Sequence, residues 1–196
     1  MLKLGVLASH QGTNFQAVAN ACEAGELQAK IALLVSNNSG AGALARARKA
    51  GIASLHLSAL THPDPAKLDA ALCDALQKAE VDLVVLAGYM KKLGPQLLAA
   101  YQRRIINVHP SLLPKHGGQG MYGMRVHEAV LQAGERQSGV TVHFVDSDYD
   151  TGDIILQAEV EVAANDTAQT LAAKIRPLEH GTLLAAIKQL QETAAT

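Results

Sequence analysis

The chain has 196 residues, with 17 lysines and arginines against 18 aspartates and glutamates, so its formal net charge is −1. This balance excludes the strongly basic footprint of a protein that binds nucleic acid or an anionic membrane surface. Apolar residues make up 48% and aromatic residues only 3%, so the core must consist of Ala, Leu, Val and Ile. The length is sufficient for one large domain with a sizeable core.

The cysteines and the hydropathy indicate the compartment. Cys22 and Cys73 lie in helix-like patterns without a partner motif, which is typical of buried thiols in a reducing environment. The segment 1–10 lacks the apolar region and cleavage site of a signal peptide. No apolar run reaches the ~18 residues that a membrane span needs. We therefore expect a cytoplasmic protein without membrane or nucleic-acid partners.

Strand and helix patterns alternate through the first hundred residues. Short apolar runs predict strands at 2–9, 31–36, 52–57 and 81–87. Amphipathic or Ala-rich segments predict helices from the loop at 10–16 through Ala24, and at 41–50 and 66–79. This alternation favours a doubly wound, mostly parallel sheet, in which the continuous apolar run at 81–87 is a central strand.

The second half adds an antiparallel edge and a terminal helix. We expect a helix at 96–101, a strand ending at His109, a mobile glycine-rich loop at 115–123 and a helix at 127–133. Strands at 140–145 and 154–162 are expected to pair antiparallel at the sheet edge. Residues 165–167 open the C-terminal helix. Asp166 and Gln169 are expected to form its capping box, and Pro177 to kink or divide it.

The loop after the first strand suits a phosphate group. Gly12, Thr13 and Asn14 lead from this loop into a helix, where unpaired backbone N–H groups and the positive helix end favour an anion. The alternative is that Thr13 or Asn14 is only an N-cap. The three-glycine dinucleotide fingerprint is absent, which argues against a nicotinamide cofactor.

An amide and an imidazole lie two residues apart at the end of one strand. Asn107 and His109 therefore project from the same face, and Pro110 ends the strand there. Open α/β sheets bind ligands at this carboxyl edge. An amide donates to an oxyanion, and an imidazole titrates near neutral pH. The alternative is a pair of polar side chains that merely satisfy each other.

Three kinds of catalytic site make different demands on these residues. A His/Asp/His zinc set that includes His143 lacks tight metal-ligand spacing. A serine nucleophile lacks the G-x-S-x-G elbow, and Ser111 has no assigned base. What remains is acyl transfer without a covalent intermediate, with an oxyanion donor, a histidine and a carboxylate from the acidic loop at 146–153.

The segment Asn107-Val108-His109-Pro110-Ser111-Leu112-Leu113-Pro114, followed by Tyr149-Asp150-Thr151-Gly152-Asp153-Ile154, resembles the signature of folate-dependent formyltransferases. Within that superfamily, the segments 9–14, 86–90, 141–145 and 179–180 are similar to those of phosphoribosylglycinamide formyltransferases, and the resemblance covers almost the whole chain. It implies a Rossmann-like formyltransferase fold in a single domain, 1–196. Residues 1–100 would form a phosphate- and nucleotide-binding half, and residues 101–196 a catalytic and folate-binding half.

The resemblance also implies an activity. The chain would transfer a formyl group from 10-formyltetrahydrofolate, a co-substrate, to the amine of glycinamide ribonucleotide in de novo purine biosynthesis, without a metal. Asn107 would hold the formyl oxygen, and His109 would support the oxyanion and act as a general acid. Asp150 would steer proton movement through His109 and water.

The resemblance further implies two binding regions. The ribonucleotide phosphate would lie at Gly12, Thr13, Asn14 and Arg176, with Glu179 on the sugar or the amine. The folate would contact Met90, Lys91, Lys92, Leu93, Asn107, Asp146, Ser147, Asp148, Tyr149 and Asp150. Lys67 or Lys92 would hold its glutamate tail, and His143 would be a core histidine that packs near Asp150.

Two rival functions stay open. A formyltetrahydrofolate deformylase would use the same three residues with water as the acceptor. A non-catalytic folate- or nucleotide-binding protein would bind without turnover. Either a monomer or a homodimer is compatible with the sequence.

Overall fold

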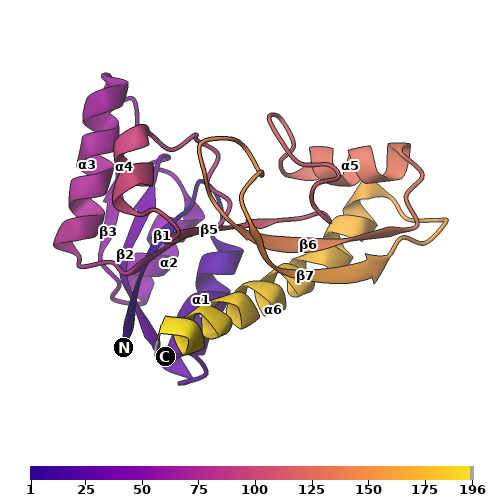
Figure 1. The fold of residues 1–196 in the computed structure, drawn as a ribbon, viewed down its shortest axis with the longest axis horizontal. Helices are drawn as coiled ribbons and strands as arrows, with labels where there is room; N and C mark the ends of the chain where they lie inside the picture. Colours follow the sequence, from indigo (N-terminus) through magenta and orange to yellow (C-terminus); the bar gives the residue numbers. More distant parts are fainter. Residues whose placement is uncertain (195–196) are drawn as a thin grey trace.

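The computed structural model describes residues 1–194, which form a seven-stranded sheet flanked by helices (Figure 1). The elements in chain order are β1 (Leu2–Leu7), α1 (Thr13–Glu23), β2 (Ala29–Ser36), α2 (Gly42–Lys49), β3 (Ser54–His56), α3 (Pro65–Lys78), β4 (Leu83–Leu86), α4 (Pro95–Ala100), β5 (Ile105–His109), α5 (Met124–Gln132), β6 (Gln137–Phe144), β7 (Ile154–Glu161) and α6 (Ala168–Ala194). Both α5 and β6 begin three residues before the predicted start.

The strand order β3-β2-β1-β4-β5-β6-β7 confirms the doubly wound sheet with an antiparallel edge. Strands β1 to β5 pair in parallel, while β6 runs antiparallel to β5 and β7 antiparallel to β6. The order reverses at β1, which lies between β2 and β4. The carboxyl ends of the parallel strands meet at one edge near this switch point, where doubly wound proteins bind ligands.

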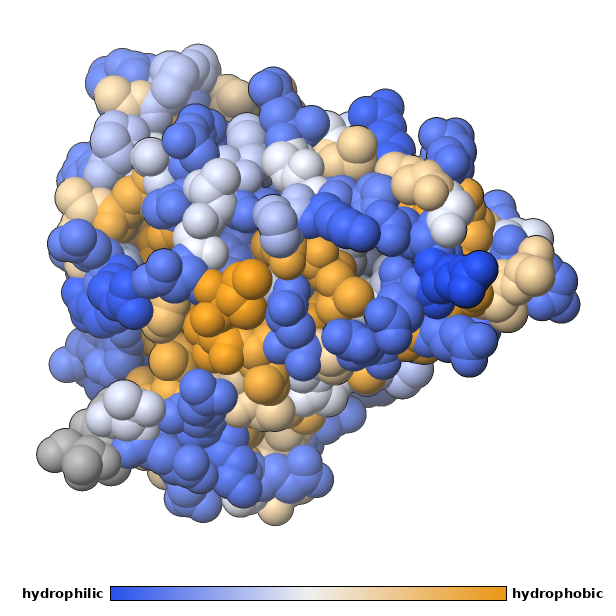
Figure 2. Space-filling model, turned by 45° about the vertical axis from the view of Figure 1, so that its right-hand side comes forward, coloured by the Kyte–Doolittle hydropathy of each residue, from blue (hydrophilic) through white to orange (hydrophobic). Residues whose placement is uncertain are grey.

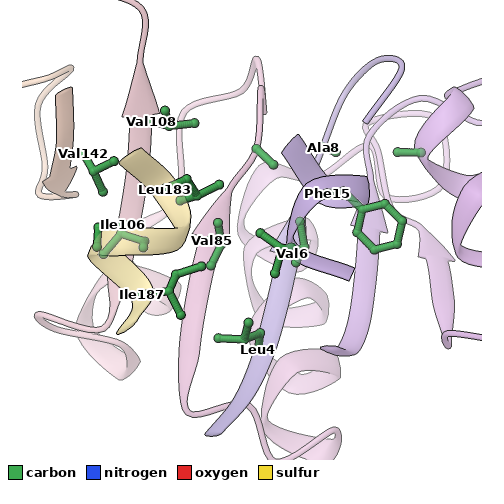
Figure 3. Packing of buried hydrophobic residues seen from close by; sticks show 14 of the residues in the cluster. Leu4, Val6, Ala8, Phe15, Val85, Ile106, Val108, Val142, Leu183 and Ile187 are labelled. Atoms are coloured by element: carbon green, nitrogen blue, oxygen red, sulfur yellow. The ribbon is translucent and has the colours of Figure 1, made fainter. Parts of the chain in front are cut away.

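Two apolar clusters cover the two faces of the sheet. One joins residues of β1, β4, β5 and β6 to α1, α2 and α6, and the other joins the sheet to α3 and α4. Figure 3 shows Leu183 and Ile187 of α6 beside Ile106 and Val85, with Phe15 of α1 on the other side of Val6. Because helices bury both faces, the central strands are continuously apolar, as the sequence pattern predicted.

Glycine and aspartate fix the starts of two helices. Gly12 is the N-cap of α1 with φ +72°, and a Cβ there would lie 2.7 Å from the Cβ of Ala43. Only glycine fits both requirements, so neither Thr13 nor Asn14 is the cap. Asp64 caps α3 by accepting the N–H of Ala66 at 2.9 Å, ahead of a proline at the first helical position.

The terminal helix α6 corrects two predictions. Pro177 was expected to kink or divide it; the helix continues without a break through Pro177, so a division is wrong. Apolar residues before and after the proline are almost fully buried against the same core, and this packing holds the two parts in one helix: Leu171, Ile175, Leu183 and Ile187.

The capping box of α6 lies one residue beyond the predicted pair. Thr167 and Thr170 exchange hydrogen bonds from backbone N–H to side-chain hydroxyl at 2.9 and 3.2 Å. Asp166 instead accepts the Thr170 hydroxyl and the Lys174 ammonium group. The prediction that Asp166 pairs with Gln169 is therefore wrong.

The edge strand β7 leaves several apolar side chains only partly covered. Ile155, Leu156 and Val160 are only partly buried, and Ile154 is 48% exposed. Figure 2 shows apolar surface gathered in the middle of one face, within a mostly polar surround. Exposed glutamates alternate with the apolar residues of this strand, which discourages pairing with another sheet edge.

Candidate active site

A cavity of about 660 Å³ opens at the carboxyl ends of β4 and β5. Its walls come from the ends of these strands, the loops 88–93, 118–123 and 145–150, the start of α5, and α6. A cavity of this size suits small-molecule substrates. The structure thus joins segments from both halves of the chain around one space.

His109 lies at the end of β5 and is buried. Its Nε2 is 2.9 Å from the backbone carbonyl oxygen of His116. A carbonyl only accepts hydrogen bonds, so Nε2 carries a proton and donates. In the neutral ring, Nδ1 therefore has a free lone pair, and it lies 3.6 Å from Oδ2 of Asp150.

Asp150 is held from several sides, although it lies in a loop. Its Oδ2 accepts the backbone N–H of Gly118 at 2.9 Å, and its Oδ1 lies 3.4 Å from Nδ2 of Asn107. Its φ of +58° is in the left-handed region, which aspartate tolerates better than most residues. The carboxylate is thereby aimed at the end of β5.

His143 of β6 lies opposite Asn107 of β5 in the antiparallel register. Its Nδ1 donates to the carbonyl oxygen of Phe144 at 2.8 Å, which leaves Nε2 of the neutral ring to accept from Asn107 at 3.2 Å. This buried imidazole also lies 3.5 Å from Asp150, as expected for a core histidine that packs beside the carboxylate.

The environment shifts the pKa values of His109 and Asp150. Burial lowers the pKa of His109, and the nearby Asp150 charge opposes this only in part. For Asp150, burial acts to raise the pKa, but His143, His109 and the Gly118 N–H outweigh it and hold the pKa below its usual value. The site at neutral pH therefore pairs a neutral imidazole with an ionised carboxylate.

A second group of polar side chains in the same cavity lining consists of Asn14, Arg176 and Glu179. Oδ1 of Asn14 is buried and has no hydrogen-bond partner among residues 1–194. Burial raises the pKa of Glu179 to about 7, against the opposing effects of Arg176 and Asn14. Gly12 and Thr13 precede Asn14 at the start of α1 but do not line the cavity.

The segments expected to bind the folate also line the cavity. Met90 to Leu93 follow β4, and Asp146 to Asp150 lie across the opening. Lys92 Nζ lies 4.0 Å from a carboxylate oxygen of Asp148 and 5.6 Å from the ring centroid of Tyr149. Lys67, the other residue expected at the glutamate tail, is not part of the lining.

The sequence reasoning missed several groups because the backbone supplies them. The His116 carbonyl and the Gly118 N–H contact the two catalytic candidates, and no residue type marks such contacts. The glycine-rich segment was predicted as a mobile surface loop, and residues 118–123 of it also line the cavity. His127 of α5 lines it as well, with a buried Nδ1 that has no hydrogen-bond partner in the described part of the chain.

Within residues 1–194, no group of three or more His, Cys, Asp or Glu side chains is arranged to hold a metal ion. Cys22 and Cys73 are free thiols. Over the same residues, no helix is both long enough and apolar enough to cross a membrane.

A doubly wound sheet with a cavity near its switch point, lined in part by Asn107, His109 and Asp150, defines the class of protein. The chain belongs to the formyl transferase family, whose profile matches residues 2–187. Its relatives include phosphoribosylglycinamide formyltransferase of Bacillus subtilis, which is 38% identical over 97% of this chain and 95% of the relative. Glycinamide ribonucleotide transformylase 1 of Symbiobacterium toebii has a similar structure, with a TM-score of 0.92, 40% identity, and coverage of 98% of this chain and 89% of that one.

Two further comparisons concern length and the rival function. The chloroplastic phosphoribosylglycinamide formyltransferase of Vigna unguiculata is 44% identical over 97% of this chain, but this chain spans only 61% of that protein. A formyltetrahydrofolate deformylase of Pseudomonas syringae has a TM-score of 0.86 at 25% identity, with coverage of 98% of this chain and 62% of that one. The fold is therefore compatible with either acceptor, amine or water.

Proposed function

We propose that this protein transfers a formyl group from 10-formyltetrahydrofolate to the amine of glycinamide ribonucleotide, a step of purine biosynthesis. One observation carries the proposal. Asn107, His109 and Asp150 line the same cavity as a second polar group that includes Arg176 and Glu179. Formyl transfer between two substrates needs both groups, because the acceptor must be held while donor and acceptor meet at one carbon.

The chemistry follows from the protonation states. The amine nitrogen bonds to the formyl carbon, and the carbonyl electron pair moves to the oxygen, where Asn107 Nδ2 donates a hydrogen bond. The neutral His109 takes the proton that the amine loses, and the resulting imidazolium is stabilised by Asp150, 3.6 Å away. The imidazolium then returns the proton to the leaving nitrogen of the folate as the carbon–nitrogen bond breaks.

Asn107 is placed to change partners during this reaction. Its contacts of 3.2 Å to His143 and 3.4 Å to Asp150 are at the long end of hydrogen-bond distances. A formyl oxygen with developing negative charge offers a stronger acceptor than either of them. We expect the amide to turn toward that oxygen when both substrates are bound.

We propose the following division of the cavity between the substrates. The pterin of the folate lies between Met90 to Leu93 and Asp146 to Asp150, beside Asn107. The ribonucleotide lies across Asn14, with its phosphate near Arg176 and the loop at 12–14, and its sugar or amine near Glu179. Backbone N–H groups at the start of α1 and the guanidinium group favour the phosphate.

The rival deformylase uses water as the nucleophile and needs no ribonucleotide. Transfer is favoured by the presence of Asn14, Arg176 and Glu179 in the cavity lining. A deformylase has no second organic substrate for a cationic and a carboxylic group to hold. We also propose a cytoplasmic location, because both cysteines are free thiols.

A spectroscopic assay of folate turnover tests the proposal, with and without the ribonucleotide. Turnover that requires the ribonucleotide and collapses in Asp150→Asn supports transfer at this site. Turnover without the ribonucleotide indicates the deformylase. Folate binding without turnover in either mixture indicates the binding protein.

A further inference from the structure

The backbone of residues 115–118 contacts both catalytic candidates that exchange protons. The carbonyl oxygen of His116 accepts from His109 Nε2 at 2.9 Å, and the N–H of Gly118 donates to Asp150 at 2.9 Å. The carbonyl contact decides which nitrogen of the neutral His109 ring carries the proton. Whatever holds this short segment therefore also sets the state of the proton-transfer pair.

The segment is not held by regular secondary structure. His116 has φ +55°, in the left-handed region, where a residue other than glycine needs support from its surroundings. Part of this support precedes it, because the buried hydroxyl of Ser111 donates to the carbonyl oxygen of Lys115 at 2.7 Å. This contact also occupies Ser111, which the sequence left as a serine without a base.

The remaining support comes from Glu135, a residue just beyond the end of α5. Its carboxylate oxygens lie 3.0 and 3.1 Å from Lys115 Nζ, and Oε1 lies 3.5 Å from Nε2 of His116. The pKa of Glu135 is lowered by Lys115 first and by His116 as well, so it is ionised at neutral pH.

The two contacts of Glu135 differ in their surroundings. The Lys115 side chain is 66% exposed, so its ion pair is screened by water. The His116 side chain is only 16% exposed, and its Nε2 is buried without a hydrogen bond in the described residues. Glu135 is the anion that faces this nitrogen, so the His116 contact is the one that restrains the ring and, through it, the carbonyl.

We propose that Glu135 is a positioning residue for formyl transfer, which holds His116 so that its carbonyl keeps His109 in the Nε2–H form. The role rests on the proposed function, because it acts on the proton-transfer pair of that reaction. Glu135 is not among the described residues that line the cavity, so we expect its loss to change turnover rather than binding.

The experiment compares Glu135→Ala with Glu135→Gln, which keeps an acceptor oxygen. We expect kcat to fall about tenfold in the alanine variant and less in the glutamine variant, with the KM of both substrates within about twofold. Lys115→Met leaves the His116 contact in place, and we expect kcat within about twofold of the original. Glu80→Gln, which removes a remote surface pair with Lys3, is the matched control.

A second readout does not depend on activity. The ¹⁵N chemical shifts of the His109 ring, recorded where the ring is neutral, report which nitrogen carries the proton. We expect the pure Nε2–H pattern in the unaltered protein and in Glu80→Gln. In Glu135→Ala the shifts should move toward an average of the two tautomers. Circular dichroism establishes that each variant is folded.

The outcomes separate the two proposals. A folded Glu135→Ala protein with unchanged His109 shifts overturns the positioning role, whether or not kcat falls. If the tautomers shift in Glu135→Ala but the unaltered protein transfers no formyl group, then the proposed function is overturned. The effect of Glu135 on the His109 tautomer still stands in that case. Shifted tautomers together with a lower kcat support both.

Discussion

The cavity is lined by two groups of polar side chains, which find hydrogen-bond partners to different extents. In the first group, Asn107, His109 and Asp150, the polar side chains contact one another, His143 or the backbone. In the second group, Asn14 Oδ1 has no hydrogen-bond partner within residues 1–194, and Glu179 has a pKa of about 7. The first group is preorganised for chemistry, while the second leaves polar atoms for a ligand to contact.

The largest expected effect comes from a substitution in the first group. In Asp150→Asn, the side chain keeps its shape and its tolerance of a positive φ, but it no longer stabilises the protonated His109. We expect kcat to fall by about 10³-fold, within the range for loss of general acid–base assistance. Steady-state measurement of folate turnover checks this, and a loss of less than about tenfold would contradict the role given to this carboxylate.

The next largest effect is expected for a second substitution in this group, which tests the oxyanion contact. Asn107→Ala removes the donor to the formyl oxygen and leaves His109 bound to the His116 carbonyl. We expect kcat to fall by about 10²-fold, comparable to the loss of one oxyanion donor. If KM of the folate rises while kcat stays the same, then Asn107 only binds the donor substrate.

The pH dependence of ribonucleotide binding sharpens the comparison, because it tests Glu179 of the second group. Below pH 7, Glu179 is protonated and neutral; above pH 7, it is ionised and accepts hydrogen bonds from the ribonucleotide. We expect KM of the ribonucleotide to rise about tenfold from pH 8 to pH 6. KM of the folate should change little over this range. In Glu179→Gln, the pH dependence of the ribonucleotide KM should disappear, and its persistence would assign it to another group.

The same carboxyl group makes a prediction for stability without substrates. The folded protein keeps the Glu179 proton up to about pH 7, whereas an exposed glutamate loses it near 4.5. Between these values the folded state binds more protons, so the free energy of unfolding falls as the pH rises. At pH 8, Glu179→Gln should be more stable by on the order of 1 kcal/mol. Urea unfolding at pH 8 and pH 4 measures this, and equal gains at both values would contradict it.

The smallest expected effect comes from an exposed charged pair in the cavity lining. Lys92 and Asp148 are both exposed, with 4.0 Å between their charged atoms. Exposed pairs contribute about 0–1 kcal/mol, so Lys92→Met should raise the folate KM by no more than about fivefold. Kinetics at two salt concentrations checks this. A much larger rise would show that Lys92 binds the folate more strongly than an exposed ion pair allows.

Sequence patterns sufficed where periodicity or a short motif decides the structure. Alternating strands and helices predicted the doubly wound sheet, and the spacing of Asn107 and His109 placed both at the end of β5. The acidic loop at 146–153 was a candidate from its residue types, but Asp150, 41 positions beyond His109, was singled out only through the resemblance, because its position depends on how the loop after β6 folds back. No pattern in the sequence reports such a distance.

The features that the sequence did not predict correctly have physical reasons of the same kind. The contacts of the His116 carbonyl and the Gly118 N–H come from the backbone, which every residue shares. Pro177 predicted a break in α6, but tertiary packing on both sides overrides the lost hydrogen bond. The pKa of Glu179 depends on burial that no local pattern shows.

The antiparallel register of β5 and β6 has a consequence for how the chain tolerates changes in length. Asn107 faces His143 because these two positions are paired, and neighbouring residues of a strand point to opposite faces. One residue inserted within β6, before His143, would turn this imidazole away from the cavity. Insertions in the segment 119–123, beyond the backbone contacts of His116 and Gly118, would leave both the strand pairing and these contacts intact. Length variation among active homologues is therefore expected to concentrate in that segment and to be absent from β6.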